Sequence, residues 1–563
     1  CCSPVAISTS SSRLEGLGLT CLARAMSWSV ERPIAETATT TRAPSLTERA
    51  MRAATLWMRS MSPTLVPPNF WTSTFEGAGW VGSGSIRNSI TPEATSWQAI
   101  PCNNMHVSQT DTPFRAAVIG AGPSGFYAAE SILKGDPVAT VDIIDRLPTP
   151  YGLVRYGVAP DHDKIKSVTG MLARTGGDPR VRFLGNVSLG ADVSIDDLLR
   201  HYHAVILATG APLDRQLGVP GEALPGSLSS TEFVAWYNGH PDFRELEPDL
   251  SATAAVVIGM GNVAVDVTRI LAKSVDELSR TDIADHALEQ LAESRVRDIY
   301  MIGRRGPAQA RFTTKELREL GELANADIMI DPEELELDPS SRMEAESDRL
   351  ITRNIEVLHG FAKTPWRDLP RTVHLRFRRS PVELSGSECL ESVRLEVNEL
   401  DGAPGLGVSA TGTGVFEDLP AGLLLRSVGY RGRPLPGVPF DAARSVIPNF
   451  RGRVLDAERG DPVPGLYTVG WIKRGPSGVI GSNKADAMET VATMAEDARR
   501  EIRPRDAQSE AVTLLLRERG VSFVDFRGWE ILDAFEVAAG EPLGRPRVKV
   551  TSVDRMLELM REQ

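Results

Sequence analysis

The chain has 563 residues and a formal net charge of −12. This length is enough for several domains with large cores, whereas the negative charge argues against general nucleic-acid binding. No apolar run reaches the roughly eighteen residues of a spanning helix, so we expect no membrane span.

Residues 1–104 differ in composition from the rest of the chain. They contain no lysine and no aspartate but hold four of the five cysteines. Because Met105 stands shortly before the first strand-like run, we expect it to be the natural start, with residues 1–104 a disordered or mis-assigned extension of a cytoplasmic protein. The alternative is a transit peptide to the mitochondrial matrix, since Arg and Ser are present and Asp is absent.

The cysteine spacing limits which metal and iron–sulfur sites the chain could hold. No C-x-x-C pair occurs, and the spacing in the extension is not that of iron–sulfur ligands. We therefore expect no metal site in the chain, and any iron–sulfur centre to be on another protein.

A first glycine motif, Gly120–Gly125, follows the apolar run Ala116–Ile119 and precedes a predicted helix over Ser124–Leu133. The next predicted strand, Val141–Ile144, ends at Asp145. Glycines at such a strand-to-helix turn let backbone amides approach a pyrophosphate, and an acid about twenty residues later accepts hydrogen bonds from a ribose. The pattern predicts a dinucleotide site, although a lone motif of this kind is often only a tight turn.

A second motif, Gly259–Ala264, follows the apolar run Ala254–Ile258. Its last position is Ala264, which is small enough to keep the helix close to the sheet. A helix-like, polar segment over Ser274–Arg295 then reads as an elaborated crossover before the predicted strand Ile299–Ile302. The chain therefore predicts two dinucleotide sites.

Arg304 and Arg305 follow the last of these strands, where the first unit has its acid. Guanidiniums bind a 2′-phosphate through bidentate, charge-assisted hydrogen bonds, whereas a carboxylate would repel it. The pair favours NADP over NAD in the second unit. The alternative is a solvated loop tip.

Three further segments are functional candidates. Thr149–Lys166 is a long loop rich in Gly and Pro, and such loops usually have a task. The strand Ala204–Leu207 ends in small residues that permit a close backbone approach. Near the C-terminus, Lys473–Gly481 precedes a predicted helix over Ser482–Arg499, which makes a third glycine-rich turn whose amides could stabilise a reduced flavin. A plain glycine connector is the alternative.

Four motifs carry a resemblance: Pro-Thr-Pro-x-Gly-Leu-Val-Arg-x-Gly-Val-Ala-Pro-Asp-His, Gly-Arg-Arg-Gly-Pro, Phe-Thr-Thr-x-Glu-Leu-Arg-Glu and Gly-Trp-Ile-Lys-Arg-Gly-Pro. Together they resemble adrenodoxin-reductase-type ferredoxin–NADP reductases, in particular the bacterial, mycobacterial FprA-like branch, from about Phe114 to Val550. The resemblance implies a glutathione-reductase-like α/β fold with two Rossmann-like, doubly wound dinucleotide-binding domains. The FAD domain would be discontinuous, over 105–213 and 430–563, with the NADP domain at 214–429.

The resemblance also implies site residues. Those expected at FAD are Gly120, Ala121, Gly122, Gly125, Asp145, Leu153, Val187, Trp471, Gly478, Val479 and Ile480. Those expected at NADP(H) are Arg215, Gly259, Gly261, Asn262, Val263, Ala264, Arg304, Arg305, Glu316 and Gly478. His162 and Glu319 are implied as the catalytic pair near the nicotinamide, bonded through water and able to orient it or relay protons, although a solvated histidine and a solvated helix face would be the default for such residues.

The implied activity is hydride transfer between NADPH and FAD, coupled to one-electron transfer with a ferredoxin. An acidic ferredoxin needs a basic docking face. Lys473 and Arg474 are candidates, as is a strand carrying His374, Arg376 and Arg378, for which we favour an ordinary solvated edge. We expect a monomer or weak homo-oligomer. The alternatives are an NADPH-dependent flavoprotein acting on oxygen, a quinone or a small substrate, and a non-catalytic dinucleotide sensor.

Overall fold

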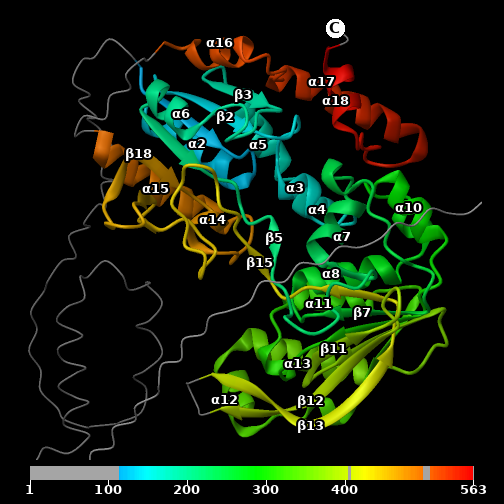
Figure 1. Ribbon diagram of the computed structural model, residues 1–563. Helices are drawn as coiled ribbons and strands as arrows, with labels where there is room; N and C mark the ends of the chain where they lie inside the picture. Colours follow the sequence, from blue (N-terminus) through cyan, green and yellow to red (C-terminus); the bar gives the residue numbers. More distant parts are fainter. Residues whose placement is uncertain (1–112, 403–406, 499–507, 562–563) are drawn as a thin grey trace, which may run out of the picture. The chain divides into compact units, whose positions relative to one another are not determined.

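Two parallel sheets organise the chain (Figure 1). The computed structural model describes residues 113–402, 407–498 and 508–561, all of which fall in one unit of the chain. The predicted extension, residues 1–104, lies outside the described residues.

The first sheet has the order β16-β17-β18-β4-β1-β2-β3. Its strands are β1 (Arg115–Ile119), β2 (Thr140–Asp145), β3 (Val181–Gly185), β4 (Ala204–Leu207), β16 (Asn449–Phe450), β17 (Arg453–Leu455) and β18 (Pro462–Thr468). The strands β18, β4, β1, β2 and β3 run parallel, and β16 and β17 add an antiparallel edge. Segments more than 250 residues apart in sequence therefore share this sheet.

The second sheet is parallel throughout, in the order β6-β14-β7-β8-β10-β9. Its strands are β6 (Ser227–Ser229), β7 (Ala254–Ile258), β8 (Asp298–Ile302), β9 (Ala326–Ile330), β10 (Arg371–Arg376) and β14 (Leu423–Arg426). The expected α/β class with parallel sheets is confirmed.

The helices are α2 (Pro123–Gly135), α3 (Leu153–Tyr156), α4 (Asp163–Lys166), α5 (Thr169–Gly176), α6 (Ile195–His201), α7 (Ser230–Tyr237), α8 (Asn262–Ala272), α9 (Val275–Leu278), α10 (Asp285–Ala292), α11 (Thr314–Gly321), α12 (Pro339–Ser347), α13 (Arg349–Ala362), α14 (Trp471–Arg474), α15 (Ser482–Ala498), α16 (Ala511–Glu518), α17 (Phe526–Gly540) and α18 (Val553–Arg561). The predicted crossover over Ser274–Arg295 forms two helices, α9 and α10, with a break at Ser279–Ala284.

Alternating side chains of β1 divide the core of the first sheet. Ala116 and Val118 pack with residues of α2, α15 and α17, whereas Ala117 and Ile119 pack with residues of α6 and α16. Since buried parallel strands need cover on both faces, their sequence is a continuous apolar run. This explains why the run before each glycine motif shows no polar alternation.

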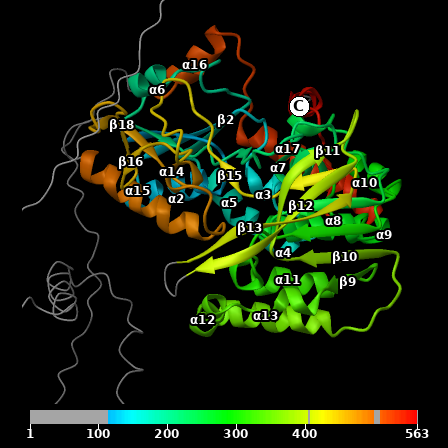
Figure 2. The ribbon, with the colours of Figure 1, turned by 60° about the horizontal axis from the view of Figure 1, so that its bottom comes forward.

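The second sheet has different cover on its two faces. One face packs against α7, α8, α10, α11 and α13. The other packs against a separate antiparallel sheet of β11 (Arg379–Ser385), β12 (Ser392–Gly402) and β13 (Val408–Pro420). The long hairpin of β12 and β13 is drawn in yellow in Figure 2. The antiparallel sheet therefore covers this second face in place of helices.

The chain leaves the first sheet and returns to it through one short ribbon. β5 (Leu213–Asp214) and β15 (Tyr430–Arg431) pair antiparallel at these two crossings. Arg215, directly after β5, donates its backbone N–H to Gly429 O at 2.9 Å. The entry and exit of the second sheet are thus held side by side.

The strand with alternating basic residues is not an edge. β10 lies between β8 and β9, and it ends at Arg376, so the prediction of a solvated strand edge that included Arg378 is wrong. His374 stacks on Tyr300 at 4.2 Å between ring centroids. Sequence alternation alone could not tell a basic edge from an interior strand whose charged residues have partners.

Over the described ranges, no helix is both long enough and apolar enough to cross a membrane.

Candidate functional site

The first glycine motif forms the turn between β1 and α2. Gly120 has φ +113°, and a Cβ there would lie 2.5 Å from Ala208 O; a Cβ at Gly125 would lie 2.1 Å from Gly120 O. The fold itself therefore requires these two glycines. At Gly122, by contrast, φ is −79° and a Cβ would have no protein atom within 4 Å. Neither strain nor a described neighbour explains Gly122, but a ligand beside the loop would.

The second motif repeats this geometry between β7 and α8. Gly259 has φ +142°, and a Cβ there would lie 2.3 Å from Ser427 O. Gly261 has φ −121° and open space around its Cβ position. Ala264 is fully buried against the sheet, as expected for a helix that must pack closely.

Both middle glycines are the N-cap residues of their helices, and neither helix has a side-chain cap. The first-turn amides of α8 are therefore left for a ligand, whereas in α2 Pro123 has no N–H and Gly125 N–H donates to Gly122 O, which leaves the amide of Ser124. The helix dipole makes such a position favourable for an anion. The two loops fit the pyrophosphates of two dinucleotides.

Asp145 supports the first loop from the end of β2. Its carboxylate accepts hydrogen bonds from the backbone N–H groups of Ala121 at 2.7 Å and Leu147 at 3.0 Å. Burial raises the pKa of Asp145 above its ordinary value, although these two amides act in the opposite direction. Val187, another predicted FAD residue, is buried and donates its N–H to Asp145 O at 2.9 Å. Asp145 thus shapes the loop, and its carboxylate keeps lone pairs for a ribose.

The third glycine-rich turn lies against the first motif. A Cβ at Gly470 would lie 2.3 Å from Ser124 Oγ, and Gly470 N–H donates to Asp486 Oδ2 at 2.5 Å. Trp471, the first residue of α14, packs on Tyr430 at 5.2 Å between ring centroids and donates from Nε1 to Ser477 O. The structure therefore brings Gly470, directly before α14, next to Ser124 of the first motif.

Side chains in this turn differ in exposure. Gly478 is exposed with φ +81°, and Val479 is 65% exposed, whereas Ile480 packs against the core of the first sheet. Leu153 at the start of α3 is also exposed, at 41%. Single exposed apolar side chains are common on protein surfaces, so Leu153 and Val479 do not by themselves mark a ligand site.

Lys473 and Arg474 are not available as a basic docking face. Lys473 is buried, with its Nζ 2.9 Å from Asp486 and 2.7 Å from Glu489. Arg474 also pairs with Asp486, at 3.2 Å. The prediction that this pair could dock a ferredoxin is not supported, because both charges are already compensated by α15.

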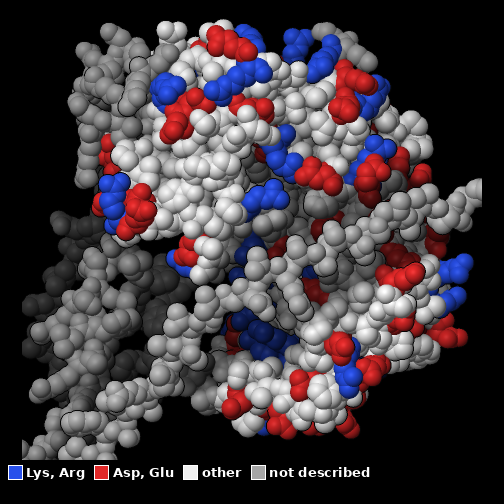
Figure 3. Space-filling view, in the orientation of Figure 1, with Lys and Arg blue, Asp and Glu red and all other residues white. Residues whose placement is uncertain are grey.

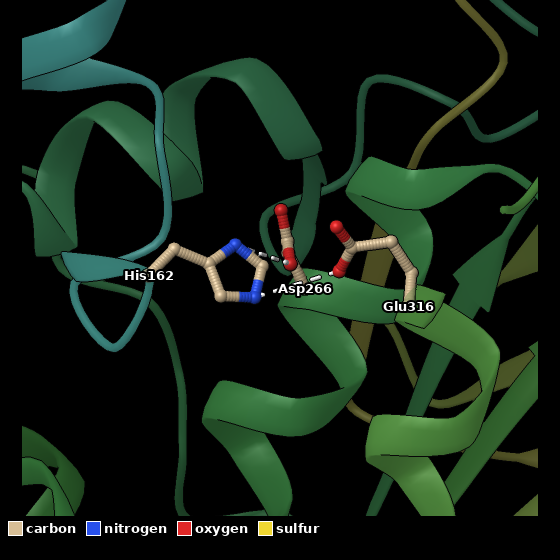
Figure 4. A group of neighbouring side chains, drawn as sticks. All are labelled: His162, Asp266 and Glu316. Carbon is tan, nitrogen blue, oxygen red and sulfur yellow. Dashed lines mark ion pairs between the residues drawn. The ribbon is translucent and has the colours of Figure 1, made fainter. Parts of the chain in front are cut away.

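His162 lies between α3 and α4 and contacts two helices that cover the second sheet, α8 and α11. Its side chain is 7% exposed, and Nε2 lies 2.8 Å from Glu319 Oε2 and 3.5 Å from Glu316 Oε2, both on α11. Nδ1 lies 3.8 Å from Asp266 Oδ1 on α8. Figure 4 shows the imidazole directed at the carboxylates of Asp266 and Glu316. His162 and Glu319 are therefore in direct contact, whereas the resemblance implied a bond through water.

Arg269 completes this cluster. Its buried guanidinium lies 2.7 Å from Glu319, 2.7 Å from Asp161 and 3.1 Å from Asp266. Asp161 also pairs with Lys273 at 2.8 Å. Sequence analysis missed Arg269 and Asp266; the signal was their helical spacing within α8, directly after the second glycine motif.

The carboxyl groups of the cluster differ in their acidity. Burial raises the pKa of Asp266 to about 7, and it also raises the pKa of Glu316. Burial acts the same way on Asp161 and Glu319, but Arg269 outweighs it at Asp161, and His162 with Arg269 outweighs it at Glu319, so both pKa values are lowered. Asp266 Oδ1 and Glu316 Oε2 are buried without a hydrogen-bond partner. The cluster therefore combines two carboxyl groups of lowered pKa, Asp161 and Glu319, with two of raised pKa, Asp266 and Glu316.

His162, Asp266 and Glu316 each offer a ligand atom within 4.8 Å of the others, a spacing that could hold a metal ion. However, Arg269 pairs with Asp266 and lies 3.5 Å from Glu316. Since the guanidinium already supplies a positive charge to this group, the arrangement favours proton exchange over metal binding.

Arg304 and Arg305 follow β8 beside the second motif. A Cβ at Gly303 would lie 2.7 Å from Met260 Cγ, and Gly259 N–H donates to Ile302 O at 2.8 Å. Arg304 is exposed and Arg305 half-buried. Neither forms an ion pair with a described carboxylate, so both are free to bind a phosphate.

Comparison with known proteins places this geometry in a family. Residues 114–303 match the model of the pyridine nucleotide-disulphide oxidoreductases. The NADPH-ferredoxin reductase FprA of Mycobacterium tuberculosis is 47% identical over 459 residues, covering 79% of this chain and 99% of the relative. The chain belongs to the FprA/adrenodoxin reductase family.

Other members of the FprA/adrenodoxin reductase family agree. The mitochondrial NADPH:adrenodoxin oxidoreductase of Homo sapiens is 43% identical over 493 residues, covering 85% of this chain and 98% of that protein. The solved structure of M. tuberculosis FprA in complex with NADPH has a TM-score of 0.75 and 46% identity, covering 80% of this chain and 99% of that one. The predicted family and its oxidoreductase class are confirmed.

Proposed function

We propose that the chain is an NADPH–ferredoxin reductase that binds FAD at the first sheet and NADP(H) at the second. The observation that carries this proposal is the pair of middle glycines, Gly122 and Gly261, whose Cβ positions face open space in otherwise closely packed loops. Full-length similarity to an NADPH-ferredoxin reductase supports the same activity.

The FAD assignment is supported by what surrounds the first loop. Asp145 holds Ala121, and the turn at 470–480 lies against Ser124. Both parts belong to one sheet, because β18 pairs with β4. This supports an FAD domain built from 105–213 and 430–563, with the NADP domain at 214–429 between the paired strands β5 and β15.

The NADP(H) assignment is supported by the second loop and its arginines. Asn262 begins α8, and its Oδ1 accepts from Thr313 N–H at 2.8 Å, which fixes the loop against the start of α11. Arg304 and Arg305 have no described carboxylate partner, so a 2′-phosphate would supply the missing negative charge. Exposed Arg215 lies at the crossing ribbon, where it could reach the same nucleotide.

When bound, the nicotinamide supplies a hydride, and the flavin accepts it and releases electrons singly to an iron–sulfur protein. The residues of the chain bind and orient both rings. His162, held by Glu319, is placed to hold or move a proton at Nε2, and Arg269 fixes Glu319 for that contact. Burial raises the pKa of Asp266 to about 7, so its carboxyl group can hold a proton near Nδ1, the other ring nitrogen of His162.

The test is reduction of the bound flavin. The full chain, purified with its flavin, is mixed with NADPH or NADH in a stopped-flow instrument, and the loss of the absorbance of the oxidised flavin is followed. A ferredoxin and cytochrome c are then added as acceptors. Rapid bleaching by NADPH and turnover with ferredoxin support the proposal, whereas no bleaching by NADPH refutes it.

The same assay separates the alternative of a flavoprotein that acts on oxygen, a quinone or a small substrate. Flavin that is reduced by NADPH but reoxidised by a quinone and not by any ferredoxin would support that alternative. A cytoplasmic location and a monomeric or weakly associating state stay predictions.

A further inference from the structure

A third arginine, Arg311, lies at the second glycine motif. Its backbone N–H donates to Met260 O, inside the motif, at 2.6 Å. Two residues later Thr313 N–H donates to the side chain of Asn262, at the start of α8. The short segment 311–313 is therefore fixed along the loop, and the side chain that it presents beside Met260 is an exposed arginine.

The guanidinium of Arg311 acts together with those of Arg304 and Arg305. Burial lowers the pKa of Arg305, and the positive charges of Arg304 and Arg311 lower it further, while the negative charge of Glu344 only partly offsets them. In the described part of the chain, none of the three forms an ion pair with a carboxylate. In Figure 3 a group of Lys and Arg side chains lies in the lower half of the face, in the area of α11 and α13 in Figure 1.

Two arginines near the ends of the adjoining strands β10 and β11 differ from these three, because they form ion pairs. Arg376, at the end of β10, and Arg379, at the start of β11, lie 3.0 and 3.2 Å from the buried carboxylate of Glu334. The backbone connects the two groups directly, since Arg378 N–H donates to Arg305 O. Arg376 and Arg379 are thus held in ion pairs, whereas the three arginines at the glycine motif form none with a described carboxylate.

We propose that Arg311 is a third arginine that binds the 2′-phosphate of NADP(H), together with Arg304 and Arg305. The inference rests on the proposed NADP(H) site and adds a residue to it. A phosphomonoester carries a charge of about −2 and three acceptor oxygens. Three guanidiniums can therefore each donate to it, and its charge relieves their mutual repulsion.

The test measures binding of two fragments to the oxidised full-length protein by calorimetry, without turnover. 2′,5′-ADP carries the 2′-phosphate and 5′-AMP lacks it. Arg311→Ala should raise the Kd of 2′,5′-ADP about tenfold, the lower end for loss of a hydrogen bond to a charged group, and should leave the Kd of 5′-AMP within about twofold. Arg311→Lys, which keeps the charge but not the fork, should give an intermediate loss.

Arg318→Ala is the matched control, because Arg318 is an exposed arginine seven residues further along, on α11. If Arg311→Ala changes the Kd of 2′,5′-ADP no more than Arg318→Ala does, while Arg304→Ala weakens it, Arg311 does not bind the phosphate and this inference is wrong. If the unmodified protein binds both fragments equally, the NADP(H) site itself is wrongly assigned, and the proposed function fails with it.

Discussion

The buried ion pair between Arg155 and Glu536 gives a quantitative prediction. Arg155, on α3, donates from Nη1 to Glu536 Oε2 at 2.9 Å and from Nη2 to Oε1 at 2.5 Å, and the two side chains are 4% and 0% exposed. Burial alone would lower the pKa of Arg155, but Glu536 and Tyr156 outweigh it and raise the value. The buried Arg155 guanidinium therefore depends on Glu536 as its charge partner, while Glu536 also lies 3.3 Å from Arg547.

Glu536→Gln keeps the shape of the side chain and an oxygen to accept from Val550 N–H, which lies 2.9 Å from Oε1. It leaves the Arg155 guanidinium buried without a charge partner. Loss of one member of such a pair costs about 3–5 kcal/mol of unfolding free energy. The contacts of Arg155 with the rings of Tyr156 and Trp529, both at 5.2 Å, recover only a small part of this.

The assay is urea unfolding followed by tryptophan fluorescence, for Glu536→Gln, Arg155→Met and the double variant. The double variant should be less destabilised than the two single variants together, with a coupling of at least about 2 kcal/mol, because it leaves no unpaired guanidinium. A single variant within about 1 kcal/mol of the unmodified protein, or additive effects, would refute the conclusion that the pair holds α17 to α3.

Three further predictions concern the site. Burial raises the pKa of Asp266 from its ordinary value of 3.8 to about 7 in the folded state, so the unmodified protein should lose stability as the pH rises from about 4 to about 7. Asp266→Asn should avoid this loss. An equal urea-midpoint difference between variant and unmodified protein at pH 5 and pH 8 would contradict this. Gly122→Ala should fold normally but retain little flavin in absorbance spectra. Gly125→Ala should instead lower the unfolding midpoint, because its Cβ would lie 2.1 Å from a backbone oxygen. The reverse pattern would show that the open space beside Gly122 is not a ligand site. Glu319→Gln should retain flavin but slow its reduction by NADPH and shift the pH profile of that rate, and an unchanged profile would argue against proton handling by His162.

The two strand-to-helix turns could be predicted from sequence because their signals are local. Continuous apolar runs, glycines and helix starts depend on neighbours within about ten residues, and the structure has β4 and β7 at their expected bounds. The pair of His162 and Glu319 came only from the resemblance, since 157 residues separate the two and a charged helix face is ordinarily solvated.

By itself the sequence determined the family, the order of the two nucleotide motifs and the expectation of an arginine pair at one of them. Only the tertiary structure decided which charges are free. Lys473 and Arg376 were expected to be surface cations, yet carboxylates elsewhere in the chain pair with both, whereas Arg304, Arg305 and Arg311 form no ion pair in the described residues. The physical reason is that an ion pair acts over a few ångströms, and which groups come that close depends on how the strands and helices pack rather than on their spacing along the chain.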